Sequence, residues 1–194
     1  MRKKNEAFTT SGQVQYVAQT GNFRKKGFAY SGALNILKVA LSYDYLWTNI
    51  RVKGGAYGCM SNFNRIGEGY LISYRDPNLK KTMEVYEGVV DYLKNFTVDE
   101  RDMTKYIIGT IGSMDMPMEA VDMGARSFHA YFLGKTEADL QKVRDQVLSC
   151  TQEDIRALAP IVKAVVEAGN RCCIGNEEKI DQNKEYFDEV KHVL

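Results

Sequence analysis

Apolar and polar positions alternate with two different periods along the chain, and these periods predict strands and helices. Between Gln13 and Thr20 the apolar side chains Val14, Tyr16 and Ala18 occupy every second position, which is typical of a half-buried strand. The other predicted strands are residues 56–63 and 70–75, paired as a hairpin around residues 64–69, and residues 171–174. These segments predict a single sheet.

A helical period begins after Ser31, a good N-cap residue, and the helix that it predicts ends at Gly54 and Gly55. Its repeating positions are Leu34, Leu37, Leu41, Tyr45 and Thr48. A second helix follows Asp76 and Pro77, which fit the N-cap and the first helical position. Its repeating positions are Leu79, Met83, Tyr86, Val90 and Leu93.

The rest of the chain is predicted to be mainly helical. Residues 97–100, Thr-Val-Asp-Glu, form a capping box, so another helix begins there and ends before Pro117. Its inward positions are Met103, Ile107, Ile111 and Met114. Further helices are predicted over residues 118–132, 137–148 and 151–167, with a charged terminal helix from about Glu185. This order predicts one α+β domain, residues 1–194, in which an antiparallel sheet packs against helices.

The composition fits a globular domain and removes several classes of function. The chain has 194 residues, of which 44% are hydrophobic and 26% charged, so it can bury a sizeable core. Its net charge of +1 supplies no general field to attract nucleic acid or an anionic membrane. The cations at residues 2–4 and 24–26 lack the aromatic pattern of an RNA-binding module, so we expect no nucleic-acid partner.

No segment suggests insertion into a membrane or secretion. A helix needs about twenty consecutive apolar residues to cross a bilayer, and no uncharged stretch is that long. Residues 1–12 begin with basic side chains but contain neither an apolar core nor a small-residue cleavage site. We therefore expect a cytoplasmic protein with no membrane partner.

The cysteines and histidines do not form a recognisable metal site. Cys59, Cys150, Cys172 and Cys173 include no C-x-x-C pair, and the two adjacent cysteines point to opposite faces of a strand, so buried thiols are expected. His129 and His192 have none of the spacings of zinc-binding helices. We expect no metal in this chain.

Nucleophile and phosphate motifs are also missing. No G-x-S-x-G elbow is present, and Ser61, Ser113 and Ser127 have no assignable partner histidine. The glycine-rich residues 54–58 lack the lysine of a phosphate-binding loop, and they follow a helix instead of preceding one. These glycines are better explained as a helix C-cap that leads into a strand.

Arg51 and Tyr57 suggest a binding site. The two residues are six positions apart, and the double glycine between them lets the backbone turn back sharply. Their side chains can then converge at one strand edge and offer a guanidinium fork and a phenolic donor to a carbonyl oxygen. The alternative is that Arg51 caps the helix C-terminus and Tyr57 fills the core. The residues alone leave both interpretations open.

The run Arg51 to Gly58, Arg-Val-Lys-Gly-Gly-Ala-Tyr-Gly, resembles a motif in the C-terminal half of insulinase/pitrilysin-family zinc metallopeptidases. The presequence protease branch is the most similar. Residues 108–117, 124–127 and 133–134 resemble its last domain in order and spacing, so the resemblance covers about residues 10–190.

The resemblance implies an architecture and a role. Family members consist of two homologous halves, each with two related α+β domains, that close around a peptide chamber. Zinc is bound by an inverted H-x-x-E-H motif in the N-terminal half, and this sequence contains none. It therefore resembles the excised last domain of a four-domain endopeptidase that degrades unstructured peptides.

The resemblance also implies site residues, a cofactor and partners. The matching arginine and tyrosine, Arg51 and Tyr57, are expected to contact the substrate carbonyl as catalytic and substrate-binding residues. Zinc is expected in the parent enzyme, held by the absent N-terminal half, and the partners are a peptide substrate and that half of the polypeptide. The isolated chain is expected to be inactive. The competing hypothesis is a non-catalytic peptide-binding or scaffold domain of the same architecture.

Overall fold

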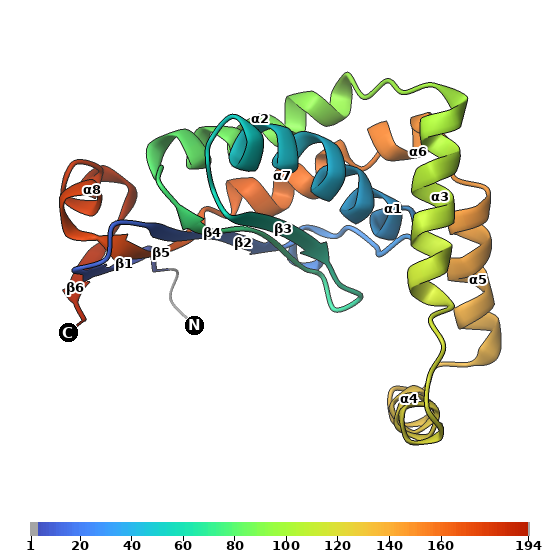
Figure 1. Cartoon of the computed structure of the whole chain (residues 1–194). Coiled ribbons are helices and arrows are strands. Elements are labelled where there is room, and N and C mark those ends of the chain that lie inside the picture. The colour runs from blue at the N-terminus through green and yellow to red at the C-terminus, as the bar shows by residue number, and fades with distance from the viewer. Residues whose placement is uncertain (1–3, 194) are drawn as a thin grey trace.

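A six-stranded sheet runs through the molecule, seen in Figure 1 in a computed structural model that describes residues 4–193. The strands are β1 (Glu6–Thr10), β2 (Gln15–Asn22), β3 (Gly58–Phe63), β4 (Glu68–Asp76), β5 (Asn170–Asn176) and β6 (Glu189–His192). Their spatial order is β3-β4-β2-β5-β1-β6. Most neighbours are antiparallel, but β1 runs parallel to both β5 and β6, so the sheet is mixed.

Helices cover one face of this sheet and leave the other face open (Figure 1). The covering helices are α1 (Ala33–Ala40), α2 (Lys80–Lys94) and α7 (Ala159–Glu167). The core lies between the two layers and includes Leu37, Tyr86 and Val162, all fully buried. The predicted α+β class, a sheet packed against helices, is therefore confirmed, with the correction that the sheet is mixed and not purely antiparallel.

The buried face of β2 is the opposite of the one predicted. Val17 is fully buried, as are Gln15 and Gln19, two positions before and after it. Tyr16, in contrast, is 44% exposed on the open face. Each glutamine has one backbone partner: the Gln19 amide donates to the Val166 carbonyl at 2.8 Å, and the Gln15 side chain accepts the Asn176 N–H at 2.9 Å. Within the described part of the chain, the Gln15 Nε2 and Gln19 Oε1 atoms are buried without a partner. Backbone partners thus satisfy only part of the polar row that faces the core.

The first long helix continues past α1 with wider turns. Residues Leu41–Tyr45 and Trp47–Val52 have π-helical hydrogen bonding, so the helix reaches the double glycine as predicted. The amide of Lys53, for example, donates to the carbonyl of Thr48 at 2.9 Å, five residues earlier. Such π segments are rare and are found frequently at functional sites.

The chain ends differ from the prediction. The segment after Glu185 is not a helix: a short 3-10 turn, Lys184–Tyr186, leads into β6, and the last α-helix is α8 (Glu177–Asp181). Strand β1, which was not predicted, provides the partner for β6. Lys191 forms an ion pair with Glu6 at 2.9 Å, so the charged side chains that suggested a helix connect two strands instead.

Three further helices form an arm beside the sheet. These are α3 (Glu100–Met114), α4 (Ala120–Phe132) and α5 (Glu137–Leu148), followed by α6 (Gln152–Arg156). The N-cap of α3 is Asp99, which accepts the Asp102 N–H, rather than Thr97. The predicted helix over residues 151–167 is divided into α6 and α7, and Thr151 forms a capping box with Asp154 at the start of α6.

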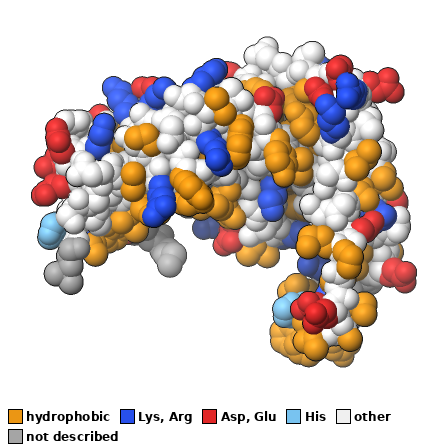
Figure 2. All heavy atoms as spheres, viewed as in Figure 1, with side chains coloured by type: hydrophobic (Ala, Val, Ile, Leu, Met, Phe, Trp, Pro, Cys, Tyr) orange, Lys and Arg blue, Asp and Glu red, His pale blue; other side chains and the backbone are white. Residues whose placement is uncertain are grey.

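Helix α4 lies at the far end of this arm, and none of its residues is buried (Figures 1 and 2). Its apolar side chains gather on the surface there (Figure 2), among them Val121, Phe128 and Phe132, which are 80%, 61% and 78% exposed. Asp115, just after α3, accepts two hydrogen bonds from Arg144 of α5 and so links the two helices. Within residues 4–193, no helix is long and apolar enough to span a bilayer.

Candidate functional site

The double glycine makes a tight turn between the helix that carries Arg51 and strand β3. The Gly55 N–H donates to the Arg51 carbonyl at 2.9 Å, and the Ala56 N–H donates to the Ile50 carbonyl at 3.1 Å. Gly55 has a φ of +82°, which an L side chain rarely adopts. A Cβ on Gly54 would collide with the Ile50 carbonyl oxygen. Both positions therefore require glycine.

Tyr57 follows this turn at the start of edge strand β3. Its N–H donates to the Arg75 carbonyl at 3.2 Å, which fixes the backbone to the end of β4. Its ring packs edge-on against Tyr74, with ring centroids 5.3 Å apart, and the side chain remains 58% exposed. A Cβ on Gly58 would collide with the Tyr74 ring, so the glycine creates the space for this packing.

Arg51 and Tyr57 lie next to each other. The guanidinium carbon of Arg51 is 4.2 Å from the Trp47 ring centroid and 5.9 Å from that of Tyr57. The Arg51 side chain is exposed, as the Tyr57 ring is. Neither residue fills the core, so both can offer hydrogen-bond donors to a ligand. Their predicted role in contacting substrate stays a prediction.

A second segment, residues 75–78, completes the site and was not predicted. The Asn78 side-chain amide donates to the Gly54 carbonyl at 2.6 Å and so holds the double-glycine turn. Asp76 is fully buried and accepts the Asn78 N–H at 2.8 Å and the Thr82 hydroxyl at 2.7 Å. The predicted helix start at Asp76 and Pro77 is wrong, because Asp76 ends β4 and α2 begins at Lys80.

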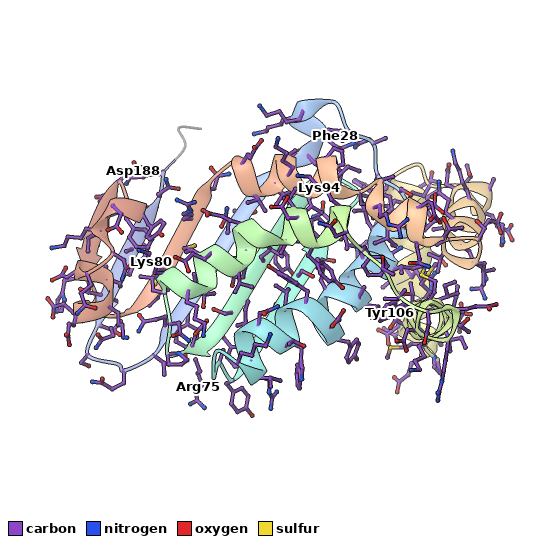
Figure 3. All side chains as sticks on the ribbon, turned by 90° about the horizontal axis from the view of Figure 1, so that it is seen from above. Phe28, Arg75, Lys80, Lys94, Tyr106 and Asp188 are labelled. Carbon is purple, nitrogen blue, oxygen red and sulfur yellow. The ribbon has the colours of Figure 1, made fainter. Side chains whose placement is uncertain are left out.

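Arg75 has an unusual backbone conformation. Its φ is +49°, and no other non-glycine residue in the described part of the chain has a positive φ. A left-handed conformation costs an L residue about 1–2 kcal/mol. The residue lies in a β-bulge: Val17 pairs with Ser73 and Gln15 with Asp76, so the single residue between them on β2 faces two on β4. Figure 3 shows Arg75 at the margin of the molecule.

The thiols and histidines do not add a nucleophile or a metal site. All four cysteines are free, and burial raises the pKa of the Cys59 thiol to about 11, against the opposing effect of the Arg51 guanidinium. His129 is exposed on α4, and His192 Nδ1 lies 2.9 Å from the Thr9 hydroxyl oxygen. Within residues 4–193, no three His, Cys, Asp or Glu side chains cluster as metal ligands would.

Comparison with known proteins identifies relatives by sequence. The family model described as the PreP C-terminal domain matches residues 5–176. "Protein HypA" of Clostridium perfringens is 47% identical over 192 residues, which cover 99% of this chain and 20% of that protein. Presequence protease 1, chloroplastic/mitochondrial, of Arabidopsis thaliana is 34% identical, covering 98% of this chain and 18% of that protein. The chain thus spans about a fifth of the length of these relatives.

Solved structures support the fold. A protease from Helicobacter pylori superimposes with a TM-score of 0.66 at 14% identity, covering 88% of this chain and 43% of that one. A protein from Pseudomonas fluorescens described as a peptidase M16 inactive domain superimposes with a TM-score of 0.61 at 18% identity, covering 89% and 43%. At these identities, the likeness establishes a common architecture only.

Proposed function

Because the chain belongs to the PreP C-terminal domain family of insulinase/pitrilysin-type peptidases, we propose that it forms the last domain of a zinc-dependent endopeptidase that degrades unstructured peptides. Relatives about five times as long support a domain within a larger polypeptide. The described residues do not fit a zinc site, so in this proposal the metal belongs to an N-terminal half outside this chain.

The role proposed for this domain is to bind the substrate carbonyl through Arg51 and Tyr57. Attack on a peptide carbonyl places negative charge on its oxygen, and donors held in advance around that oxygen lower the barrier. The Tyr57 hydroxyl and the Arg51 guanidinium are such donors. The observation that carries the proposal is their convergence, with the guanidinium 5.9 Å from the ring centroid while both side chains are exposed at the sheet margin.

The open face of the sheet supports a peptide as the ligand. Tyr16, Met60 and Ile174, on β2, β3 and β5, are each more than 40% exposed, and the covering helices lie on the other face of the sheet (Figure 1). Extended peptides offer both apolar side chains and carbonyl oxygens, which match this face and the two donors beside it. The cytoplasmic location stays a prediction, and the Arabidopsis relative is named as chloroplastic and mitochondrial.

Replacing Tyr57 by Phe in the longer polypeptide tests this function. The change removes one hydrogen-bond donor and keeps the ring, so melting temperature and zinc content should be unchanged. Loss of such a donor should lower kcat by about 100 to 1,000-fold. Steady-state kinetics with an unstructured fluorogenic peptide measure the effect. Normal turnover would remove the catalytic role and leave the non-catalytic scaffold or peptide-binding domain as the better description.

Arg51→Lys provides the companion variant. An ammonium keeps the charge but lacks the planar fork, so a guanidinium that grips a carbonyl oxygen cannot be replaced by it. Substrate binding should weaken more for this variant than for Tyr57→Phe if Arg51 also holds the ground-state carbonyl. A helix-capping role for Arg51 predicts instead a lower melting temperature with normal kinetics.

A further inference from the structure

Arg75 is the residue near the candidate site whose conformation has no local explanation. Glycine is the usual residue for a left-handed position in a β-bulge, since it has no Cβ to strain. An arginine with a φ of +49° occupies the position here. The side chain must therefore offset the strain in the backbone, or serve a purpose other than stability.

Both ends of Arg75 contact the same neighbour. Its carbonyl oxygen accepts the Tyr57 N–H at 3.2 Å, and its guanidinium carbon is 5.8 Å from the Tyr57 ring centroid. Among residues 4–193, no carboxylate lies within ion-pair distance of Arg75. The bulge thus directs an unpaired cation toward a tyrosine ring, within the range of a cation–π contact.

Besides Arg75, the Tyr57 ring has only weak constraints, one of which is the Arg51 guanidinium, 5.9 Å from the ring centroid. The ring is 58% exposed, and its remaining aromatic contact is the edge of Tyr74. An exposed ring held only by such contacts can change rotamer easily, and each change moves the hydroxyl by several ångströms. A cation from β4 at 5.8 Å from the ring centroid restricts that movement.

We propose that Arg75 is a positioning residue, which holds the Tyr57 ring so that its hydroxyl faces the substrate carbonyl. The inference rests on the proposed function of Tyr57 and extends it to a residue in another strand. It also explains why the position is not glycine: glycine would relax the bulge but release the ring.

The test compares Arg75→Gly and Arg75→Lys in the longer polypeptide. Arg75→Gly should keep or raise the melting temperature, because the strain is relieved, while kcat falls about threefold to fivefold with KM nearly unchanged, the size expected of an exposed cation–π contact. Arg75→Lys should restore most of the lost turnover, because an ammonium also binds a ring face. A lower melting temperature with normal kcat would make Arg75 a structural residue and overturn the proposal.

A double-mutant cycle with Tyr57→Phe separates this proposal from the proposed function. In the Tyr57→Phe background no hydroxyl remains to be positioned, so adding Arg75→Gly should cost less than twofold further. Fully additive losses would overturn the positioning role. If Tyr57→Phe alone has normal turnover, the proposed function fails; if it is impaired while Arg75→Gly is normal, only the positioning role fails.

A matched control variant, and a measurement that does not depend on catalysis, test the same role of Arg75. Arg65 lies in the β3–β4 turn with its guanidinium 5.4 Å from the Tyr30 ring, so Arg65→Gly removes the same kind of contact away from the site and should leave kcat unchanged. In this 194-residue chain labelled with 3-fluorotyrosine, the Tyr57 fluorine resonance should shift in Arg75→Gly and not in Arg65→Gly. An unchanged Tyr57 resonance in Arg75→Gly would overturn the proposal.

Discussion

Gly54 shows how strongly one position in the site is constrained. A Cβ there would collide with the Ile50 carbonyl oxygen. The Ile50 carbonyl is held by the Ala56 N–H and the Gly54 carbonyl by the Asn78 amide, so neither carbonyl can move away freely. Gly54→Ala should lower the free energy of unfolding of this chain by about 1–3 kcal/mol, as overpacking does elsewhere. Urea denaturation measures the change.

Gly112, in the last turn of α3, is the matched control for that substitution. A Cβ there meets nothing within 4 Å, so Gly112→Ala should raise the free energy of unfolding by up to about 1 kcal/mol through helix propensity. Equal effects of the two substitutions would contradict the steric account of the double-glycine turn.

At the residue scale, the site was only partly predictable from the sequence. Arg51 and Tyr57 could be predicted to lie close together because the two glycines between them indicate a sharp turn. The position of Arg75 could not be identified from the sequence, because arginine is not a residue type that indicates a positive φ. The Asp-Pro pair predicts a helix N-cap at Asp76. In the structure the buried Asp76 carboxylate instead accepts hydrogen bonds from Asn78 and Thr82.

At the element scale, long amphipathic helices and the β3–β4 hairpin were predicted well, and the sheet margins were not. The buried face of β2 carries two glutamines, which pattern analysis assigns to solvent because their backbone partners lie more than a hundred residues away. Strands β1 and β6 are short and polar. Their stability comes from pairing with distant strands, β6 with β1 and β1 with β5 and β6, which a local window of sequence does not contain.

The ion pairs between β1 and β6 make this margin sensitive to acid. Hydrogen bonds from Lys191 and Lys4 lower the pKa of Glu6, and Lys4 lowers that of Glu189. Carboxyls with a lowered pKa stabilise the folded state fully above their ordinary pKa, about 4.3, and lose that contribution as the pH falls from there through the lowered pKa. Below about pH 4 the amides of β6 should lose protection from hydrogen exchange before the central Val17 amide does.

Salt and a substitution check that explanation. The pairs are exposed, so added salt at neutral pH should weaken the same margin in the same order. Lys191→Met should make exchange in β6 less dependent on pH. If β6 and Val17 lose protection together in acid, the opening is global and the ion pairs are not its cause.

For the whole molecule, the exposed helix α4 should control association of this chain. Large apolar patches on an isolated domain favour self-association. We therefore expect concentration-dependent oligomers in sedimentation, and monomers after Phe128 and Phe132 are both replaced by Ser. Tyr43→Ser is the control, because Tyr43 is 74% exposed but lies outside the arm. Oligomers that persist in the double variant would assign association to another surface.

The position of β1 determines the order in which this domain can be completed during synthesis. Strands β2, β3 and β4 can pair as soon as the first 76 residues have emerged, but β1 bonds only to β5 and β6. The Thr10 hydroxyl, for instance, meets its Gly175 partner across 165 residues. On the ribosome, β1 must therefore wait unpaired while all the helices of the arm are made. Its polar residues Glu6, Thr9 and Thr10 favour hydration of the unpaired segment, which protects the nascent chain from aggregating through an open strand edge.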